Sequence, residues 1–335
     1  MSKNKVSLTG IKPTGRPHVG NWLGMYEPAL RLAEREDVDG YYFIADYHAL
    51  TSVRNADEMR ALTLDCAATW LAFGLDPSNT LLYRQSDVPE VFELSWALAC
   101  MTPKGFMNKA HAYKAARDAN VAAGQDSDVG VNMGLYTYPV LMAADILVVD
   151  ADIVPVGKDQ VQHVEIARDV AQRLNATFGE GTLKLPVAEL KKETAVVPGL
   201  DGRKMSKSYG NTLPCFETAK RTRKAVMRIT TDSTPPEQPK DPESSLVYQI
   251  HRALLTPEQA VELAGRYREG ISWGHAKQAL FEGLEERLAE PREQFHRLMS
   301  DPDTLEDILR DGARRVREVT GPVVERLRSA IGIQG

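Results

Sequence analysis

The sequence predicts a doubly wound α/β fold for the first part of the chain and an all-α fold for the rest. Two observations lead to this division. Strand-like segments alternate with helix-like segments over residues 6–101, whereas helical periodicity dominates residues 246–327. Strands that alternate with helices require crossover connections, which make neighbouring strands parallel. We therefore expect one domain at residues 1–213 and a helical domain at residues 214–335.

Glycine and proline separate the elements of the α/β part. Gly74 and Pro77 follow one helical segment, and Pro103 and Gly105 follow the next. Both residue types interrupt regular structure, so they mark its ends. The strands, rich in β-branched and aromatic residues, are expected at residues 6–11, 40–45 and 80–84, and the helices at about 19–34, 56–73 and 88–101.

The helical part follows a proline-rich loop at residues 235–242. Hydroxyl or carboxylate side chains just before a helical pattern are typical N-caps, and proline suits the first turn. On this basis we predict helix starts at Thr256 and Ser272, and a break between two helices at Asp301 and Pro302.

Composition limits the classes of protein to which the chain can belong. Hydrophobic residues make up 43% of its 335 residues, which is enough to bury a large core. The longest apolar run, residues 138–149, contains Asp145 and is shorter than the roughly 20 residues that cross a membrane. Residues 1–8 contain no apolar stretch of secretory length. We expect a cytoplasmic globular protein without a membrane segment.

The cysteines argue against a disulfide-stabilised or metal-binding protein. Cys66, Cys100 and Cys215 are odd in number, far apart and form no CxxC pair. Neither a disulfide framework nor a four-cysteine zinc or iron–sulfur site fits this spacing. We expect three reduced thiols and no metal held by protein side chains.

Basic residues gather in one segment although the net charge of the chain is −5. Residues 191–228 contain ten basic side chains, Lys191 and Lys192 among them, and three acidic ones. A solvated face is the simplest explanation of such a run. A local positive surface also suits a polyanion, whatever the net charge of the whole chain.

The turn at residues 12–21 joins the first strand to the first helix. It contains Pro13, Gly15 and Pro17, and the helix begins after His18. Free backbone N–H groups at a helix start favour phosphate, and a flat ring can lie against a glycine such as Gly20. His18 and Asn21 can hydrogen-bond to phosphate or ribose. Taken alone, a turn of this kind is usually only a turn.

A second element, residues 199–208, combines glycines with lysines and hydroxyls. Lys204, Ser206, Lys207 and Ser208 form a compact group able to bind an anion. Such a loop can neutralise the charge that develops when a phosphoryl bond breaks. It is not a P-loop, because no GxxxxGK[ST] spacing occurs in the chain.

Together these elements resemble the signature pair of class I aminoacyl-tRNA synthetases. Residues 17–21 (PHVGN) are similar to the family's HIGH box, and residues 204–208 (KMSKS) match its second motif at all five positions. The resemblance implies a Rossmann-like catalytic domain in which the two loop lysines, with Lys12, are catalytic. It implies that ATP is bound by Lys12, Thr14, His18, Gly20, Asn21, Gly157, Asp159, Lys204, Met205, Ser206, Lys207 and Ser208.

A third element, residues 134–147, indicates the amino acid. Tyr138, Met142 and Asp145 stand at helical spacing on one face, and Pro139 suits a first helical turn. One carboxylate on an apolar face can cap or salt-bridge a neighbour, or it can accept the N–H of an indole while Met142 packs on the ring. The stretch resembles that of bacterial tryptophanyl-tRNA synthetases, in which the indole-binding role applies. Tyrosine enzymes of this subclass usually carry Gln where Met142 stands.

Residues 154–169 (VPVGKDQVQHVEIARD) resemble another motif of the tryptophan enzymes. Asp159 with Gln162 forms a capping-box pattern, which predicts a helix start. The resemblance adds ATP ribose as the ligand of Asp159 and places Gln160 near the substrate. The pair of His163 and Glu165 is also found in zinc deaminases, but the PCxxC partner that these enzymes require is absent.

Two further residues complete the expected pocket. His48 follows the second strand in a segment, residues 46–51, that is similar to the family's DxHALT, and sites of parallel sheets form at the carboxyl ends of strands. A tryptophan-lining role and a structural role are nearly equal alternatives for His48. With Gly10, the expected tryptophan-binding residues are Gly10, His48, Tyr138, Met142, Asp145 and Gln160.

Lys12 departs from the family pattern, because many bacterial relatives carry Gln at this place. A fixed cation near the α-phosphate can replace part of the electrostatic work of Mg²⁺. Our hypothesis is that this chain needs less Mg²⁺ than Gln-bearing relatives do.

The resemblance implies a two-step reaction that needs L-tryptophan, ATP with Mg²⁺ on its phosphates, and tRNA(Trp). Tryptophan attacks the α-phosphate, pyrophosphate leaves, and the adenylate esterifies the terminal adenosine of the tRNA. The family forms homodimers, its helical domain reads the anticodon, and DNA and membranes are not partners. A tyrosine-specific synthetase, a synthetase-like regulator and a small-molecule nucleotidyltransferase remain as alternatives.

Overall fold

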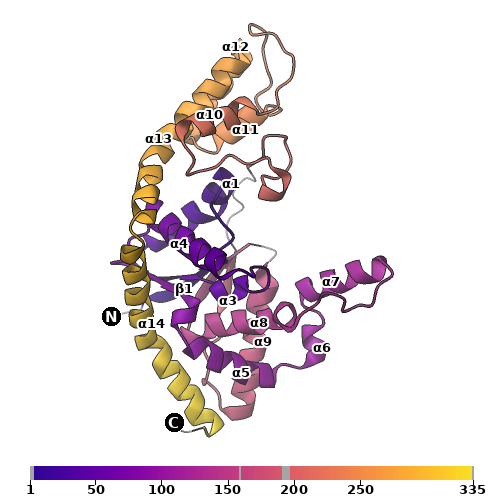
Figure 1. Cartoon of the computed structure of the whole chain (residues 1–335), viewed down its shortest axis with the longest axis vertical. Coiled ribbons are helices and arrows are strands. Elements are labelled where there is room, and N and C mark those ends of the chain that lie inside the picture. Colours follow the sequence, from indigo (N-terminus) through magenta and orange to yellow (C-terminus); the bar gives the residue numbers. More distant parts are fainter. Residues whose placement is uncertain (1–3, 158–159, 191–196, 334–335) are drawn as a thin grey trace.

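The structure is a computed structural model that describes residues 4–157, 160–190 and 197–333 (Figure 1). Within these residues, five parallel strands form one sheet in the order β3-β2-β1-β4-β5. The strands are β1 (Lys5–Ile11), β2 (Val38–Ile44), β3 (Leu81–Arg84), β4 (Ile153–Val156) and β5 (Val187–Leu190). The chain runs outward from β1 to β3 and then returns to place β4 on the other side of β1. Ligands of such sheets bind where the order reverses, at the carboxyl ends of the strands.

Alternating side chains of the strands enter two separate cores. Tyr42 and Ile44 of β2 belong to one core, and Tyr41 and Phe43 belong to the other. This alternation is the period of two expected of a strand that is covered on both faces. The predicted α/β fold with a doubly wound parallel sheet is therefore confirmed.

Helices cover both faces. The first core contains residues of α1 (Val19–Asn21), η1 (Trp22–Tyr26), α2 (Glu27–Ala33), α4 (Ala56–Ala72), α11 (Leu246–Arg252), α12 (Pro257–Glu269) and α13 (Trp273–Met299). The second core contains residues of α5 (Glu90–Met101), α8 (Met133–Val148), α9 (Val161–Phe178) and α14 (Pro302–Ile331). The other helical elements in the described part of the chain are α3 (Asp46–Ala49), η2 (Gln85–Asp87), α6 (Lys104–Met107), α7 (His111–Ala122), η4 (Lys207–Tyr209) and α10 (Ala219–Met227).

The helix predicted at residues 19–34 is present but contains a π-helical turn, η1. Pro28 lies at the start of the following α2 segment. Proline has no N–H and its ring crowds the carbonyl four residues earlier, so a regular α-helix is unfavourable here. A wider turn is a common solution to such a conflict.

One local prediction about a helix start is wrong. Helix α8 begins at Met133 with Asn132 as its N-cap, so Pro139 lies in the helix interior and not in its first turn. The start predicted near Asp159 agrees with α9, which has Gln160 as its N-cap. The Gln162 side chain bonds to the backbone of Lys109 and His111. Asp159, the other member of the predicted capping box, lies outside the described residues.

The starts predicted in the helical part are confirmed. The Thr256 side chain accepts from Gln259 N at the start of α12, the Ser272 side chain accepts from His275 N at the start of α13, and Asp301 caps α14. No described helix is both long enough and apolar enough to cross a membrane.

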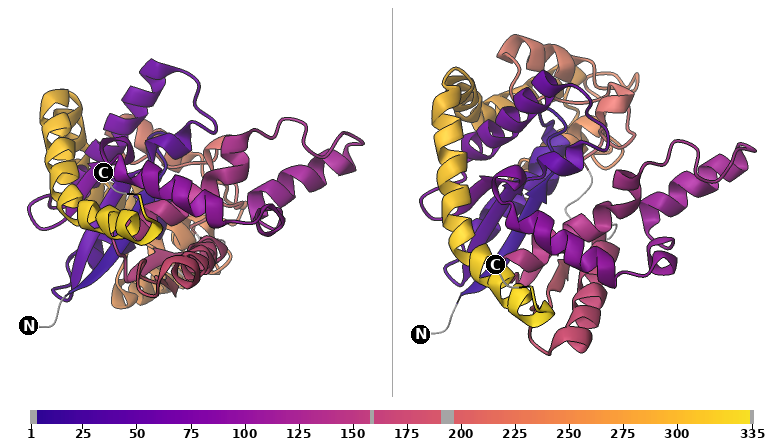
Figure 2. Two further views of the ribbon diagram at one scale, coloured as in Figure 1. Left: turned by 90° about the horizontal axis from the view of Figure 1, so that it is seen from below. Right: turned by 60° about the horizontal axis from the view of Figure 1, so that its bottom comes forward.

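Helices α13 and α14 form a long arc along one side of the molecule (Figures 1 and 2). Helix α14 returns to the sheet and packs along β3 and α5. At Gly312 the helix lies so close to the Leu82 carbonyl that a Cβ atom would overlap it. Arg84 of β3 forms a salt bridge with Glu306 of α14. The end of the helical part is thus built into the core of the α/β part.

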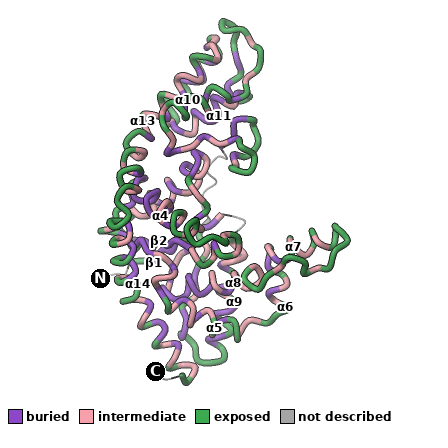
Figure 3. The backbone as a smooth tube through the Cα atoms, viewed as in Figure 1, coloured by how far each residue is buried: buried purple, intermediate pink, exposed green. Residues whose placement is uncertain are grey.

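Residues 104–122, to which the sequence assigned no element, form α6 and α7. Helix α7 points away from the body in Figures 1 and 2. Its residues are exposed or half-buried except Tyr113, whereas the buried residues concentrate in the sheet and its covering helices (Figure 3).

Candidate active site

A cavity of about 580 Å³ lies at the carboxyl ends of β1 and β4, where the strand order reverses. Its size is typical of a pocket for a small molecule. Every residue expected to bind tryptophan lines it: Gly10, His48, Tyr138, Met142, Asp145 and Gln160. Lys12, expected at ATP, lines it as well. Apolar walls come mainly from Phe43, Ile146, Val154 and Val156.

The Asp145 carboxylate on α8 is 2% exposed and carries two side-chain hydrogen bonds. Gln85 Nε2 donates to Oδ1 at 2.7 Å, and His48 Nε2 lies 2.9 Å from Oδ2. Burial raises the pKa of this carboxyl, and the hydrogen bonds from His48 and Gln85 oppose the rise. A carboxylate has about four acceptor positions and these bonds use two of them, so it can still accept from a donor that enters the cavity.

The position of His48 is compatible with both of the roles that the sequence left open. Its ring lines the cavity, and its Nε2 atom bonds to Asp145. Gln85 is a residue that the sequence reasoning missed. It directly follows β3, so the rule that sites form at carboxyl ends of parallel strands points to it.

His163 is the second missed residue. It lies on α9, lines the cavity, and its Nε2 atom is 2.9 Å from the Tyr138 hydroxyl. Its sequence neighbourhood resembles a motif of the tryptophan enzymes, but that resemblance assigned no role to His163. The Tyr138–His163 pair joins α8 to α9 across the cavity wall.

Gly10 shapes the cavity through its packing. A Cβ atom at this position would collide with the Phe43 ring. The absence of a side chain thus lets Phe43 of β2 lie flat against β1 beside the cavity.

Lys12 directly follows β1 and lines the cavity. Its Nζ atom donates to Thr51 Oγ1 at 2.8 Å, and this hydroxyl donates to the carbonyl of His48 at 2.8 Å. Burial lowers the pKa of Lys12. The ammonium group thus has a neutral partner and lines the same cavity as Asp145.

The turn at residues 12–21, which we call the first turn, also contacts residues 199–208, which we call the lysine loop. Lys207 Nζ donates to the carbonyl of Thr14 at 3.1 Å, and burial lowers the pKa of this lysine. His18 Nδ1 accepts from Asn21 N at 3.2 Å, and Asn21 Oδ1 accepts from His18 N at 3.3 Å, so the two residues form a capping box. Burial, followed by the charges of Lys207 and Lys204, lowers the pKa of His18 to about 4. Neutral His18 keeps Nε2 for a ligand.

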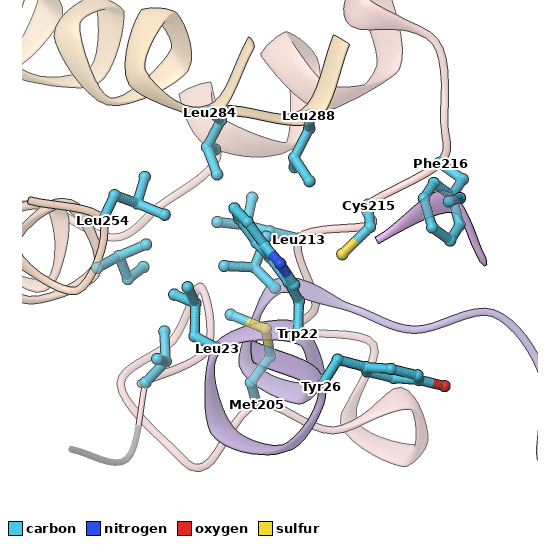
Figure 4. Close-up of a cluster of buried hydrophobic side chains, with 14 of the residues drawn as sticks. Trp22, Leu23, Tyr26, Met205, Leu213, Cys215, Phe216, Leu254, Leu284 and Leu288 are labelled. Carbon is cyan, nitrogen blue, oxygen red and sulfur yellow. The ribbon is translucent and has the colours of Figure 1, made fainter. Parts of the chain in front are cut away.

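Met205 anchors the lysine loop in the core. Its side chain is buried with Trp22, Leu23 and Tyr26 (Figure 4), and Gly20 N lies 3.4 Å from its sulfur. On the side where a Cβ atom would lie, Gly20 faces the His18 ring and the Met205 side chain.

Of the remaining expected ATP residues, Ser206 and Ser208 lie on the lysine loop, Gly157 follows β4, and Asp159 lies outside the described residues. Ser206 Oγ and Ser208 Oγ are 2.8 Å apart on the lysine loop. Gly157 follows β4, and its carbonyl accepts from Gln160 N at 3.0 Å. Asp159 is not described, and neither are Lys191, Lys192 and Glu193 of the basic segment.

The geometry joins two chemically different regions through the first turn. Residues 10–12 line an apolar cavity with one buried carboxylate, and residues 14–20 contact a loop with two lysines. The loop itself is not part of the cavity lining. The first region suits a flat apolar ligand with one N–H donor, and the second suits a polyphosphate.

Comparison with known proteins agrees with this geometry. Residues 2–289 match the family model of class I tRNA synthetases for tryptophan and tyrosine (W and Y). The chain is 50% identical to a tryptophan–tRNA ligase of Pseudomonas aeruginosa, over 98% of this chain and 73% of that one. It is 48% identical to a tryptophan–tRNA ligase of Neisseria meningitidis, over 100% and 99% of the two chains.

Comparison with a solved structure agrees with these sequence matches. The tryptophanyl-tRNA synthetase of Campylobacter jejuni, complexed with ADP and tryptophan, superimposes with a TM-score of 0.89 at 41% identity and covers 98% of this chain and 99% of that one. The signature pair, the cavity and these likenesses lead to one conclusion: the chain belongs to the class I tRNA synthetases of the tryptophan and tyrosine group.

Proposed function

We propose that the chain activates L-tryptophan with ATP and transfers it to the 3′-terminal adenosine of tRNA(Trp). The observation that carries this proposal is the buried Asp145 carboxylate in an otherwise apolar cavity. The relatives named tryptophan–tRNA ligase, and the ADP and tryptophan of the Campylobacter jejuni structure, support the same substrates.

In this proposal the indole lies between the apolar walls, and its N–H donates to Asp145. Met142 packs on the ring, which suits its flexible and polarisable thioether. Tyr138, His48, Gly10 and Gln160 complete the surroundings of the amino acid. A phenylalanine side chain has no N–H, and a buried acceptor left without a partner costs about 1–3 kcal/mol. A site built around one polar group can therefore select strongly.

The carboxylate of tryptophan attacks the α-phosphate of ATP in line. A bond forms between a carboxylate oxygen and the α-phosphorus, and the bond from this phosphorus to the bridging oxygen of pyrophosphate breaks. No side chain serves as nucleophile, so catalysis consists of positioning and charge stabilisation. Lys12 is assigned to the α-phosphate, and Lys204 and Lys207 to the leaving pyrophosphate. Mg²⁺ belongs to the proposal as the counter-ion of the ATP phosphates.

The remaining ATP contacts follow from the two segments that meet beside the first turn. We assign the nucleotide to Thr14, His18, Gly20 and Asn21 of the turn and to Met205, Ser206 and Ser208 of the loop. Because the Met205 side chain is buried, its contribution is through the backbone. Gly157 and Asp159 are assigned to the ribose side by resemblance alone.

The helical part is proposed to bind the tRNA, with the domain boundary between residues 213 and 214. Helix α10 supports this role, because five basic side chains on it or at its end are exposed: Lys220, Arg221, Arg223, Lys224 and Arg228. Exposed cations of this kind bind the RNA backbone without reading its sequence. The compartment that we propose for this reaction is the cytoplasm.

A homodimer is the assembly that we propose. Trp96 on α5 is 74% exposed, and Phe92 one turn earlier contacts Tyr47, which is 45% exposed. Large aromatic side chains gathered on a surface mark an interaction site. The second copy of the chain is the expected occupant, and sedimentation of wild type and Trp96→Glu tests it.

Amino-acid-dependent ATP–pyrophosphate exchange tests the function directly. Tryptophan, and not tyrosine or phenylalanine, is expected to support exchange, and tRNA(Trp) is expected to accept the product. Exchange that depends on tyrosine would identify a tyrosine enzyme instead. Exchange without transfer to tRNA would identify a protein that has lost the second step.

A further inference from the structure

Asn211 follows the lysine loop by three residues and is only 3% exposed. Gly210 before it has a φ of 62°, a backbone conformation that glycine adopts easily. This turn ends η4 and directs the Asn211 side chain back into the loop that contains Lys204 and Lys207.

The side-chain amide of Asn211 binds three separate points of that loop. Its Oδ1 atom accepts from Ser206 N at 2.8 Å. Its Nδ2 atom donates to Asp201 Oδ1 at 2.7 Å and to the carbonyl of Lys204 at 3.2 Å. These bonds use both donors and the acceptor of the amide, so its orientation is fixed.

The backbone around Asn211 is fixed as well. Its carbonyl accepts from Leu200 N at 3.0 Å, and Gly199 lies so close that a Cβ atom there would collide with the Asn211 amide. Asp201, in turn, bonds to Arg203, and its hydrogen bonds, that from Asn211 first, lower its pKa to about 2. The two ends of the loop are thus joined through one buried side chain.

The loop shape that results determines where the lysines lie. Asn211 binds the carbonyl of Lys204 and the N–H of Ser206, on either side of Met205. Met205 then docks at Gly20, and Lys207 reaches the carbonyl of Thr14. Every one of these contacts depends on the loop backbone between residues 201 and 207.

We propose that Asn211 is a positioning residue for adenylate formation: it holds the loop in the shape that brings Lys204 and Lys207 to the first turn. This inference rests on the proposed function and adds a residue that touches neither tryptophan nor ATP. A misplacement of about 1 Å can cost on the order of 100-fold in rate, so loss of the amide is expected to lower the rate of adenylate formation by that order.

The test compares single-turnover adenylate formation in wild type and Asn211→Ala, together with tryptophan affinity and transfer from preformed adenylate to tRNA. We expect a loss on the order of 100-fold in the first step, with the other two quantities within about two-fold of wild type. Asn175→Ala is the matched control, because Asn175 is also a buried asparagine that binds backbone at both its oxygen and its nitrogen, on Leu183. The Asn175→Ala variant is expected to be less stable than wild type but to show no selective loss of adenylate formation.

Two further variants separate positioning from general destabilisation. If Asn211 acts through Lys207, the double variant that combines Asn211→Ala with Lys207→Ala is expected to lose much less of the adenylation rate than the product of the two single losses. Asn211→Asp alone places two carboxylates together, whereas Asn211→Asp with Asp201→Asn restores a donor and an acceptor between the two positions. The double variant is therefore expected to regain activity relative to Asn211→Asp.

Failure of the inference is distinguishable from failure of the proposed function. If wild type shows no tryptophan-dependent exchange, the proposed function is wrong. If wild type is active, either of two results would show that Asn211 is not a positioning residue. In the first, Asn211→Ala forms adenylate at the wild-type rate. In the second, Asn211→Ala lowers adenylate formation, tryptophan affinity and transfer to tRNA to the same extent as Asn175→Ala does.

Discussion

The amide of Gln85 donates a 2.7 Å hydrogen bond to the carboxylate of Asp145, although the two residues are 60 positions apart in the chain. Both side chains are buried. The bond fixes the carboxylate plane and, with His48, opposes the rise in its pKa that burial causes. An ionised, fixed carboxylate can only accept hydrogen bonds, which makes it a selector for N–H donors.

Asp145→Ala is expected to reduce discrimination between tryptophan and phenylalanine. The indole N–H would lose an acceptor, a change of about 1–3 kcal/mol, or roughly 5- to 150-fold in relative kcat/KM. The measurement is kcat/KM for exchange with each amino acid. Asp150→Asn is the control, since Asp150 follows the same helix but pairs with Arg326 outside the cavity. An unchanged ratio in Asp145→Ala would remove Asp145 from the recognition site.

Lys207→Ala is expected to slow adenylate formation by about 10²- to 10³-fold, the usual loss when one donor to a developing anion is removed. Tryptophan affinity should stay near that of wild type, because Lys207 contacts the first turn at Thr14 and not the cavity. Single-turnover adenylation and equilibrium tryptophan binding check the two statements. Lys220→Ala, on the exposed face of α10, is the control. Equal adenylation rates in wild type and Lys207→Ala would contradict the assignment.

Lys12→Gln is expected to raise the Mg²⁺ concentration needed for half-maximal adenylate formation. The Lys12 ammonium lines the cavity and has a neutral partner, Thr51, so its charge is free to act on a phosphate. The measurement is a titration of Mg²⁺ at fixed ATP. Lys109→Gln is the control, because Lys109 is exposed and lies between α6 and α7. If the Mg²⁺ dependence of Lys12→Gln matches that of wild type, the Lys12 ammonium does not replace any of the electrostatic role of Mg²⁺.

Gly312→Ala is expected to destabilise the protein by about 1–3 kcal/mol, the range typical of overpacking. The new methyl group would overlap the Leu82 carbonyl, which belongs to β3. Gly321→Ala on the same helix has no neighbour within 4 Å and should raise stability by about 0.5–1 kcal/mol, because alanine favours helix. Urea unfolding of both variants measures the difference. Equal effects at the two positions would mean that α14 does not pack as described.

His251 makes stability depend on pH in the acid range. Burial, followed by the charge of Arg266, lowers its pKa to about 4, against 6.5 in the unfolded chain. Between these values the unfolded state binds more protons, so acidification through this range favours unfolding by up to about 3 kcal/mol. His251→Leu should lose less stability between pH 7 and pH 4.5 than wild type does. His18 has the same sign of shift and is present in both proteins, so its contribution cancels. If the free energy of unfolding depends on pH in the same way in wild type and His251→Leu, the prediction is contradicted.

Residues whose role depends on local order could be predicted from the sequence. The lysine loop, the turn at His18 and the spacing of Tyr138, Met142 and Asp145 each occupy a short stretch, so periodicity and motif identify them. The N-caps at Thr256 and Ser272 belong to the same group.

Residues whose role depends on distant partners could not be predicted. Gln85 and His163 acquire their partners only when separate elements meet, and no local pattern encodes these pairings. Pro139 was misplaced because α8 extends one and a half turns before it, where Asn132 supplies the cap. The bonds of the Gln162 side chain to the backbone of Lys109 and His111 likewise join separate segments and follow from no local pattern.

The packing of α14 against β3 has a consequence for the order of events during synthesis. The edge of the sheet at β3 stays uncovered until α14 has left the ribosome, since this helix supplies Gly312 and Glu306, one of the partners of Arg84. A nascent chain therefore carries an open, apolar strand from the synthesis of β3 until α14 has formed. Chaperones that shield such edges would be needed during this interval, and premature termination within α14 would leave a product prone to aggregation.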